Sequence, residues 1–524
     1  MSTLGAYFRL ARAGWVMVRE GVVAALPGDD LEGPPRLAWR AARLLARNRA
    51  RKRDRSERIA KAIERLGPSY VKLGQFLATR PDVVGHEIAV DLATLQDRMA
   101  TFPRAASVTA IEGSIGQPVS ALFASLDEPV AAASIAQVHS ATIDDGEQTR
   151  RVAVKVIRPG VRRRFYRDLE GFFLAAHLQE RFIPSSRRLK PVEVAQTLAQ
   201  TTKIEMDLRL EAAALSEMAE NIADDPGFRI PSVDWARTGR DVVTMEWIDG
   251  VKMSDVEGLR AAGHDPVALA ATLIQSFLRH TLRDGFFHAD MHPGNLFVEA
   301  DGTIVAVDFG IVGRLGRKER RFLAEILYGF IRRDFRRVAE VHFEAGYVPG
   351  HHDVAAFAQA LRAIGEPIHG QPAETISMAK LLTLLFEVTE LFDMQTRPEL
   401  LLLQKTMVVV EGVARTLDPH FNMWKTAEPV VGSWIAENLG PRGVISDARE
   451  GVGAMLSLAR QAPDLAARTE RLSREIDAMA ENGLRFDAET AEAIGRAEAR
   501  HSRWGRAALW VIAISAAVIA WQLV

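Results

Sequence analysis

The sequence predicts an α+β fold of two lobes, with a helical extension before them and a membrane-spanning helix at the end of the chain. Strand-like runs occur between residues 130 and 157 and again after residue 241, which indicates a small lobe built on a sheet. A predicted hairpin with acidic residues at its ends follows at 288–310. Mostly helical patterns come after Gly316, which indicates a larger helical lobe.

Composition restricts the classes of protein to which the chain can belong. Its 524 residues are enough for several domains and a large core. Its 66 Lys and Arg residues balance 67 Asp and Glu residues, so charge gives no reason to expect a nucleic-acid partner. The absence of cysteine excludes disulfides, thiolate zinc sites and a cysteine nucleophile. The 13 histidines are scattered without metal-ligand spacing.

Residues 1–59 are predicted to form amphipathic and basic helices. Apolar side chains alternate with arginines near the start, and eleven Lys or Arg residues stand against two acids between Arg36 and Lys61. Such a segment suits a membrane surface, anionic lipid head groups, a partner, or simply a solvated helix face, and the sequence leaves these open. No secretory signal peptide is evident, whereas a mitochondrial presequence has a similar composition.

Residues 60–125 are predicted to form the helical extension. Gly67-Pro68 is typical of a helix start, the run Ser69–Phe76 has apolar residues at helical spacing, and Pro81 should end the helix. Lys72 and Gln75 are three residues apart and therefore share one face. Two further helices are expected, over 86–99 and 107–115.

The small lobe is predicted over residues 126–250. The small, apolar run Val130–Ala141 alternates toward its end, and after a turn Arg151–Ile157 is strand-like with a single lysine, Lys155. Taken alone, Lys155 would be an exposed strand lysine. Together, however, the two strands, the turn and a lysine on the second strand would form the upper sheet of a kinase-like lobe. A later strand is expected over 241–248, where a kinase-like fold crosses between its lobes.

Two long helices are expected within this lobe, over 162–181 and 191–224. The second carries the acids Glu205, Asp207 and Glu211. At about 100° per residue, Asp207 and Glu211 share a face while Glu205 lies about 120° from Glu211. One regular helix therefore cannot bring all three to one ion. One of them could pair with Lys155, and solvated charge is the alternative for each.

The stretch from His288 to Gly310 carries the strongest chemical signal. Two short strands flank Asp301-Gly302, which is a hairpin-turn signal, so Asn295 and Asp308 should meet at one end of the hairpin beside Asp290. Two oxygen ligands and a third carboxylate there suit Mg²⁺ and a phosphate chain. Protein kinases place a base, a metal-binding Asn and a metal-binding Asp in this order. The alternative is a polar loop beside a hairpin.

The large lobe is predicted over residues 251–425, beginning with an apolar helix over 267–282. A C-terminal helical segment is expected over 426–503. Breaks between helices are expected at three Gly- or Pro-containing sites, near 349–350, 370–372 and 440–441.

The last eighteen residues, Ala507–Val524, carry no charge. As a helix this segment would be roughly 27 Å long, close to the hydrocarbon thickness of a bilayer. Arg503 and Arg506 precede it, which favours a cytoplasmic catalytic body and a C-terminus that crosses outward. The sequence therefore predicts a single-pass protein of the inner (cytoplasmic) membrane.

Five ordered motifs resemble the UbiB family of atypical, protein-kinase-like proteins, over roughly residues 60–425. The motifs are Lys72-Leu73-Gly74-Gln75 (KxGQ), the alanine-rich loop Ala131-Ala132-Ala133-Ser134, Glu205-Met206-Asp207 (ExD), the segment His288–Asn295, and Asp308-Phe309-Gly310. The resemblance implies an atypical kinase-like fold of two lobes. A bacterial member is preferred over a mitochondrial one.

The resemblance also implies roles for these residues, with ATP and Mg²⁺ as cofactors. Lys155, Glu211 and Asp290 would be the catalytic set, as phosphate lysine, its helix partner and base, while Asn295 and Asp308 would hold the metal. The loop residues Ala131, Ala132, Ala133 and Ser134 would bind nucleotide with Lys155. Gating residues on and beside the extension would restrict the substrate route: Lys72, Gln75, Glu205 and Asp207.

In biological terms the resemblance implies a role in ubiquinone (coenzyme Q) biosynthesis. The implied partners are membrane lipids, polyprenylated quinone precursors and other enzymes of that pathway, and a homodimer stays open. An ATPase is the leading interpretation. A small-molecule or lipid kinase and a nucleotide-binding scaffold are the alternatives. No flavin fingerprint, cysteine cluster or iron triad supports direct oxidation.

Deletion of residues 507–524 should move the protein from the membrane to the soluble fraction, because the uncharged helix is the predicted anchor. The measurement is fractionation of cells that express the full-length or the shortened chain. A shortened chain that stays with the membrane would assign the anchoring to the basic N-terminal helices instead.

Overall fold

The computed structural model describes residues 3–25, 40–47, 53–369 and 388–439. Within these ranges it leaves out short stretches: 42, 79, 94–98, 145, 147, 183–186, 188–189, 389–390 and 395–397. Residues up to Ile435 belong to one compact unit. The expected breaks near 370–372 and 440–441, most of the 426–503 segment and the predicted span 507–524 lie outside the described residues.

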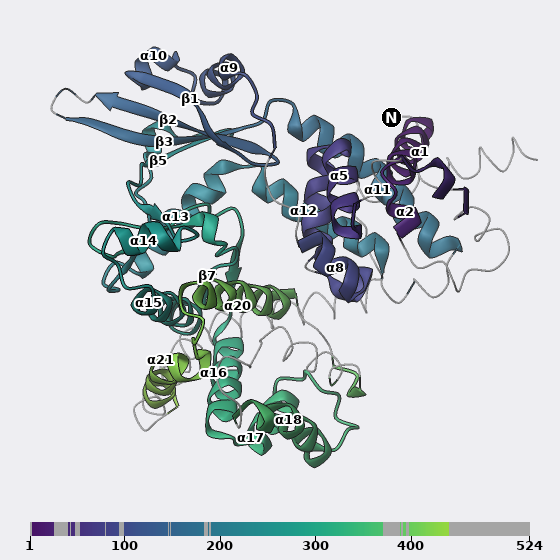
Figure 1. Ribbon diagram of the computed structural model, residues 1–524, viewed down its shortest axis with the longest axis vertical. Coiled ribbons are helices and arrows are strands. Elements are labelled where there is room, and N and C mark those ends of the chain that lie inside the picture. Colours follow the sequence, from purple (N-terminus) through teal and green to yellow (C-terminus); the bar gives the residue numbers. More distant parts are fainter. Residues whose placement is uncertain are drawn as a thin grey trace, which may run out of the picture. The chain divides into compact units, whose positions relative to one another are not determined.

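The small lobe is built on an antiparallel sheet of four strands in the order β1-β2-β3-β5. The strands are β1 (Ser125–Ala132), β2 (Ala136–Asp144), β3 (Thr149–Ile157) and β5 (Val242–Glu246). Helix α9 (Arg104–Ile115) packs on this sheet, and the short α10 (Val119–Leu122) lies beside it (Figure 1). Their apolar faces form a separate core with Ile111 and Val154 fully buried.

The strand β1 was not predicted as a separate element. Its register against β2 shifts on both sides of Pro129, because proline cannot donate to a ladder hydrogen bond. That shift removes the alternation by which a strand is recognised in sequence. The strands β2, β3 and β5 lie where strands were predicted, and Lys155 lies on β3.

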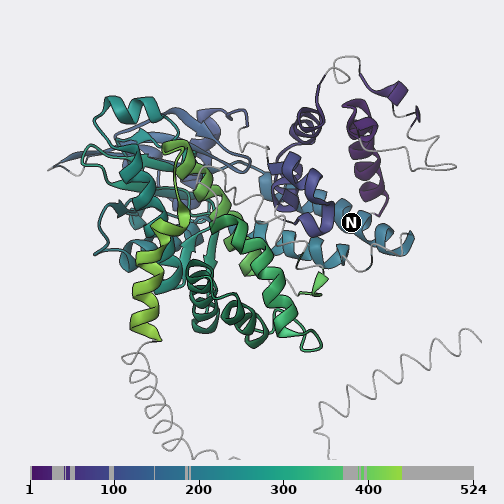
Figure 2. The same ribbon diagram turned by 60° about the horizontal axis from the view of Figure 1, so that its bottom comes forward.

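The N-terminal helices form a group with two long helices of the small lobe. They are α1 (Thr3–Arg19), α2 (Val22–Ala25), α5 (Arg55–Leu66), α6 (Pro68–Ala78), α7 (Pro81–Val84) and α8 (His86–Ala93). Helices α1 and α6 pack on α11 (Val161–Phe182), and Figure 2 shows the purple N-terminal helices beside the blue ones. Ile59, Ile63, Val71 and Leu92 are buried between them. Helix α6 ends before Pro81, as predicted.

The prediction of a single helix over 191–224 is wrong. The chain forms two helices there, α12 (Pro191–Glu205) and α13 (Leu208–Asn221). Residues far away in the chain form hydrogen bonds with the backbone groups at the break. The Leu208 N–H donates to the carbonyl of Arg240 (3.0 Å), and the carbonyl of Met206 accepts from the guanidinium of Arg162. The Asp207 side chain caps α13 by accepting from the Arg209 N–H. Glu205 and Glu211 therefore lie on different helices.

The large lobe begins with the helices α14 (Val256–Ala261) and α15 (Pro266–Arg279), followed by a short π-helix, η3 (His280–Asp284). A second sheet has the order β4-β9-β8-β6, from β4 (Phe228–Arg229), β6 (Val251–Lys252), β8 (Leu296–Val298) and β9 (Ile304–Ala306). Strands β8 and β9 pair antiparallel, which confirms the predicted hairpin. A third pair joins β7 (Phe286–His288) to β10 (Val312–Arg314).

The rest of the described chain is helical, as predicted. Its helices are α16 (Arg317–Arg332), α17 (Phe335–Glu344), α18 (Val354–His369), α20 (Pro398–Leu417) and α21 (Met423–Asn438). The break near 349–350 is confirmed. Helix α20 packs on α15, which fixes it beside the loop after β7. In the described part of the chain, no helix is both long and apolar enough to span a bilayer.

Replacement of Gly285 by alanine should destabilise the fold. Gly285 has φ +65, and a Cβ there would lie 2.4 Å from the carbonyl oxygen of Leu315, so the turn before β7 cannot accept it without a shift. We expect the free energy of unfolding to fall by at least about 1–2 kcal/mol. Urea unfolding is the measurement.

The matched control is Gly412→Ala on an exposed face of α20, where nothing lies within 4 Å of the added Cβ. This change should leave stability unchanged or raise it by up to about 1 kcal/mol, because alanine favours helix. Equal destabilisation by both substitutions would contradict the requirement for glycine at the turn before β7.

Candidate active site

A buried lysine joins the small lobe to the large lobe. Lys155 of β3 donates from Nζ to Glu211 Oε1 of α13 (2.6 Å) and to Asp308 Oδ1, two residues after β9 (2.9 Å). The Lys155 side chain is 9 % exposed and the Glu211 side chain 5 % exposed. The structure therefore brings together three of the predicted site residues, and it removes the alternative that Lys155 is an exposed strand lysine.

The charges in this cluster shift each other's pKa values. Burial lowers the pKa of Lys155, but the charges of Asp308 and Glu211 outweigh burial and raise it above its ordinary value. Burial raises the pKa of Glu211 to about 7, although Lys155 opposes the shift. Burial acts to raise the pKa of Asp308. The charge of Lys155, with a smaller effect of Lys72, outweighs burial and lowers this pKa to about 2. Lys155 and Asp308 are therefore charged at neutral pH, and Glu211 is near its midpoint.

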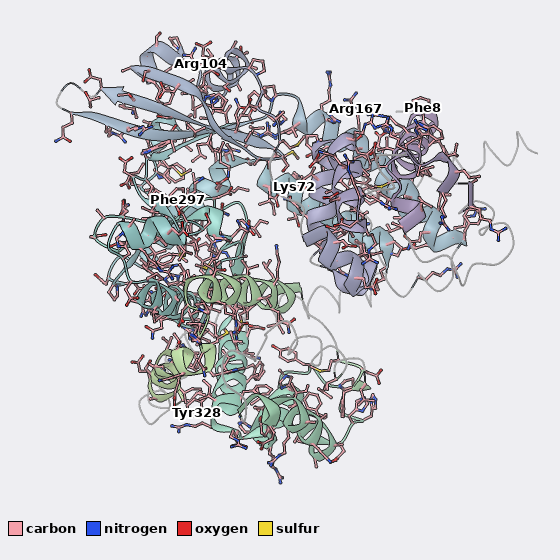
Figure 3. The ribbon with its side chains drawn as sticks, in the orientation of Figure 1. Phe8, Lys72, Arg104, Arg167, Phe297 and Tyr328 are labelled. Atoms are coloured by element: carbon pink, nitrogen blue, oxygen red, sulfur yellow. The ribbon has the colours of Figure 1, made fainter. Side chains whose placement is uncertain are left out.

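The helical extension contributes a second lysine. Lys72 of α6, labelled in Figure 3, forms an ion pair with Glu205 at the end of α12 (2.8 Å), and both side chains are largely buried. The positive charge of Lys72 also acts on Asp308, and the negative charge of Glu205 acts on Glu211. Gln75, one turn further along α6, has a buried side-chain oxygen. The KxGQ helix thus reaches the charge cluster around Lys155.

Asp207 is not part of this cluster. Its carboxylate caps α13 and accepts from the guanidinium of Arg209 (2.7 Å and 2.9 Å), which lowers its pKa. The ExD motif is therefore divided, with its first acid paired to the extension and its second acid holding the start of α13 in place.

The loop after β7 places the predicted base. The Asp290 N–H donates to Nδ1 of the buried His288 (2.9 Å), and His288 Nε2 lies 3.2 Å from the carbonyl of Val307. Burial lowers the pKa of His288, so the ring is neutral and carries its proton on Nε2. The hydroxyl of Thr406 on α20 lies within hydrogen-bond distance of the carbonyls of Ala289 (3.1 Å) and Leu402 (2.8 Å). The loop is therefore held from both sides.

The predicted metal ligands meet at the end of the hairpin. The Asn295 amide nitrogen donates to the Asp290 carbonyl (3.1 Å), which leaves its amide oxygen for another partner, and the Val307 N–H donates to the Asn295 carbonyl (2.9 Å). Asp308 has φ 64 and a side chain that is 42 % exposed. Carboxylate and amide oxygens are ligands that suit Mg²⁺, so the donor set fits this ion.

The alanine-rich loop is the turn between β1 and β2. Ala131 and Ala132 end β1, the Ala133 N–H donates to the carbonyl of Ala136 (2.8 Å), and Ser134 is fully buried. A Gly-rich loop presents several backbone N–H groups to phosphates. Here the N–H of Ala133 is engaged within the hairpin, so the turn has fewer such donors to offer a nucleotide.

A short strap, Met99–Phe102, runs from the extension across this turn. The Met99 N–H donates to the carbonyl of Ala132 (3.3 Å). Arg158 donates to the carbonyls of Ala100 (2.9 Å) and Ala133 (3.4 Å), and Gln137 exchanges two hydrogen bonds with the backbone of Phe102 (2.9 Å and 3.1 Å). The extension and the alanine-rich turn are therefore connected through named hydrogen bonds.

Sequence reasoning assigned no role to several of these residues. His288 lies in the segment that carries the predicted base, and its position two residues before Asp290 is the signal that points to it. Arg158, Gln137 and Thr406 carry no such signal, because their partners lie 25 to 117 residues away in the chain.

Comparisons with known proteins show the family of the chain. Residues 94–342 match the model of the ABC1 atypical kinase-like domain, and residues 361–422 match that of the UbiB helical domain. A protein of Marinobacter nauticus called "Probable protein kinase UbiB" is 39% identical over 464 residues, 87% of this chain and 84% of that protein. The chain belongs to the UbiB family. A UbiB relative from Aeromonas hydrophila has the same name and is 38% identical. The match covers 89% of this chain and 86% of the relative's chain.

Membership of the UbiB family confirms the atypical kinase-like fold, mixed in α and β and mostly helical. A solved structure called the complex of Rv3197 with erythromycin, from Mycobacterium tuberculosis, is 24% identical and covers 72% of this chain and 97% of its own. Its TM-score is 0.45.

Replacement of Glu211 by glutamine should change how stability depends on pH. The pKa of Glu211 lies near 7 in the folded protein and near its ordinary value of 4.5 in the unfolded chain, so the folded state binds the proton more tightly. The stability that this group contributes is therefore present at acid pH and is lost as pH rises through 7. The difference in unfolding free energy, wild type minus variant, should fall by up to about 3 kcal/mol between pH 5 and 8.

The matched control is Glu246→Gln. Burial raises the pKa of Glu246, but the hydrogen bonds from Arg229 and Ser232 and the charge of Arg229 together outweigh burial and lower the pKa. Its contribution should therefore decrease as pH falls, which is the opposite sign. Urea unfolding at several pH values measures both. A difference for Glu211→Gln that stays flat or rises between pH 5 and 8 would contradict the raised pKa.

Proposed function

We propose that this UbiB protein is a Mg²⁺-dependent ATPase that supports ubiquinone biosynthesis, anchored in the inner membrane and acting on the handling of polyprenylated precursors. One observation carries the proposal. Lys155, Glu211 and Asp308 are assembled in hydrogen-bond contact from three different elements, beside the loop that holds Asp290 and Asn295. A scaffold that only binds partners has no need of this complete set.

Each residue has a task that its geometry supports. Lys155 would donate to phosphate oxygens, and Glu211 would keep the ammonium group aligned. Asp290, fixed by His288 and α20, would orient a water or hydroxyl nucleophile. Mg²⁺ held by Asn295 and Asp308 would neutralise the charge that develops on the phosphates.

The helical extension limits which phosphoryl acceptors can reach Asp290. The ion pair of Lys72 with Glu205 holds α6 against α12, next to the charge cluster. A protein substrate approaching Asp290 would have to displace this helix. The alanine-rich turn also offers fewer backbone donors than a Gly-rich loop. Both features favour water or a small acceptor over a generic protein.

The membrane setting follows from the substrates that the family relation suggests. Ubiquinone precursors carry a polyprenyl tail and reside in the bilayer, so a predicted anchor at 507–524 would keep the site close to them. Hydrolysis would then drive a change in the extension that helps lipid intermediates reach other enzymes of the pathway.

A small-molecule kinase is the second candidate, because it would use the same residues with a phenol hydroxyl in place of water. The restriction of the site by Lys72 and Glu205 supports this candidate equally. The two functions differ only in where the phosphoryl group is found after the reaction.

Replacement of Asp290 by asparagine should reduce phosphate release about 100-fold or more, since the variant cannot accept the nucleophile's proton. Full-length wild type and variant are compared in liposomes with Mg²⁺ and ATP, with and without a ubiquinone-precursor-like phenol. Asp301→Asn, at the turn of the same hairpin, is the control and should keep wild-type rates.

Three results separate the possibilities. Free phosphate from wild type alone supports the ATPase. A phosphorylated phenol seen by mass spectrometry supports the kinase. Equal phosphate release by wild type and Asp290→Asn under every condition would exclude the proposed hydrolysis.

A further inference from the structure

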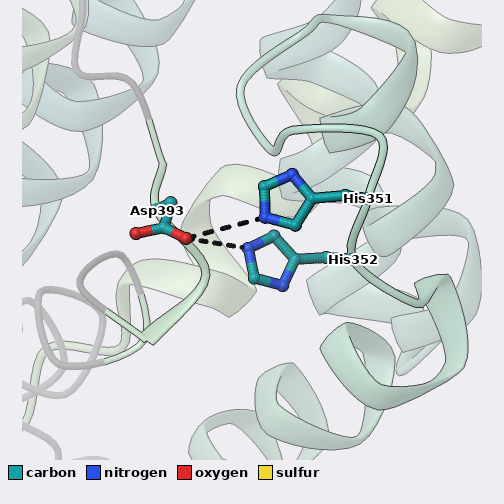
Figure 4. A group of neighbouring side chains, drawn as sticks. All are labelled: His351, His352 and Asp393. Carbon is teal, nitrogen blue, oxygen red and sulfur yellow. Dashed lines mark hydrogen bonds and ion pairs between the residues drawn. The ribbon is translucent and has the colours of Figure 1, made fainter.

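Two histidines and an aspartate outside the kinase-like site lie together in the helical part of the large lobe (Figure 4). His351 and His352 follow the turn after α17, and Asp393 precedes α20. Asp393 Oδ2 lies 3.2 Å from His352 Nε2 and 3.7 Å from His351 Nε2, and all three ligand atoms lie within 4.8 Å of one another. Sequence spacing did not indicate this cluster, because Asp393 is 41 residues from His352.

Two of the three distances between ligand atoms are close to the spacing of ligands around one ion. Ligand atoms that lie about 2.0–2.2 Å from zinc in a tetrahedral site are about 3.3–3.6 Å from one another. The two measured separations of 3.2 Å and 3.7 Å lie on either side of that interval. Three ligands fill one face of the tetrahedron and leave the fourth position to water, which the exposed side chains of His351 and Asp393 permit (67% and 68%).

Packing holds His352 in place, while His351 and Asp393 are largely exposed. The His351 and His352 rings lie 4.1 Å apart, and the His352 ring lies 5.3 Å from Phe392. Phe392 is buried against Phe357 of α18, with ring centroids 4.9 Å apart. The residue that follows it, Asp393, has φ 49, a backbone conformation that L-residues other than Asn and Asp seldom adopt. His352 and the backbone at Asp393 therefore provide the fixed part of the cluster, and the exposed His351 side chain completes it.

We propose that His351, His352 and Asp393 bind a divalent transition-metal ion of the zinc class. Two imidazole nitrogens and a carboxylate oxygen suit Zn²⁺, Co²⁺, Ni²⁺ and Cu²⁺, whereas Mg²⁺ and Ca²⁺ prefer oxygen ligands alone. The chain has no cysteine, so no thiolate competes for such an ion. The bound ion joins the turn between α17 and α18 to the segment before α20.

The ion has a structural role, because none of its ligands belongs to the kinase-like set. Helix α20 holds the loop of Asp290 through Thr406, so an ion that fixes the segment before α20 supports that loop at a distance. The competing explanation is an ion pair between Asp393 and protonated histidines that binds no metal.

Zinc titration of the full-length protein tests the proposal. The protein is treated with a chelator, desalted and titrated with Zn²⁺ by calorimetry, and Co²⁺ absorption reports tetrahedral nitrogen and oxygen ligation. We expect one site per chain, with affinity at least tenfold weaker in both His352→Ala and Asp393→Asn. His264→Ala, a histidine outside the cluster, is the control and should bind as wild type does.

A second readout is the thermal midpoint, which Zn²⁺ should raise in wild type and in His264→Ala but not in the two ligand variants. Because His351 is largely exposed, His351→Ala provides a further variant that should fold normally and lose the same site. Equal stoichiometry and affinity for Zn²⁺ in wild type and all ligand variants would overturn the proposal and leave the ion pair as the explanation.

Discussion

A buried ammonium group shared by two carboxylates is the interaction on which the rest of the structure depends. Lys155 comes from the sheet of the small lobe, Glu211 from a helix and Asp308 from the large lobe. Loss of one partner from such a pair leaves an uncompensated charge and costs about 3–5 kcal/mol. The sheet, α13 and the hairpin are therefore tied to one another at a fixed separation, and this separation defines the site.

The extension adds a second pair of charges to the first. With Lys72 and Glu205 included, two ammonium groups face three carboxylates in a largely buried space. Glu211 has a pKa near neutrality because of this environment, so it titrates easily when the local charge changes. Lys72 of the extension acts on the same cluster, because its positive charge lowers the pKa of Asp308.

Local patterns were sufficient to predict the elements whose residues are neighbours in the chain. The β8–β9 hairpin, the KxGQ helix and the strand of Lys155 all carry short-range signals, and the family motifs predict the site residues on them. The break at Met206 could not be predicted, because Arg162 and Arg240, far away in the chain, take its backbone groups. The cluster of His351, His352 and Asp393 was missed for the same physical reason.

The break at Met206 gives the acids of the ExD region separate supports. Glu205 ends α12, while Glu211 belongs to α13, and Arg162 and Arg240 brace the joint between the two helices. The two helices make different contacts at the site, because Glu205 pairs with Lys72 of the extension while Glu211 pairs with Lys155 of the sheet. A substitution that removes the ion pair of Lys72 with Glu205 would therefore loosen the contact between α6 and α12 and leave the hydrogen bond of Lys155 with Glu211 on α13 in place.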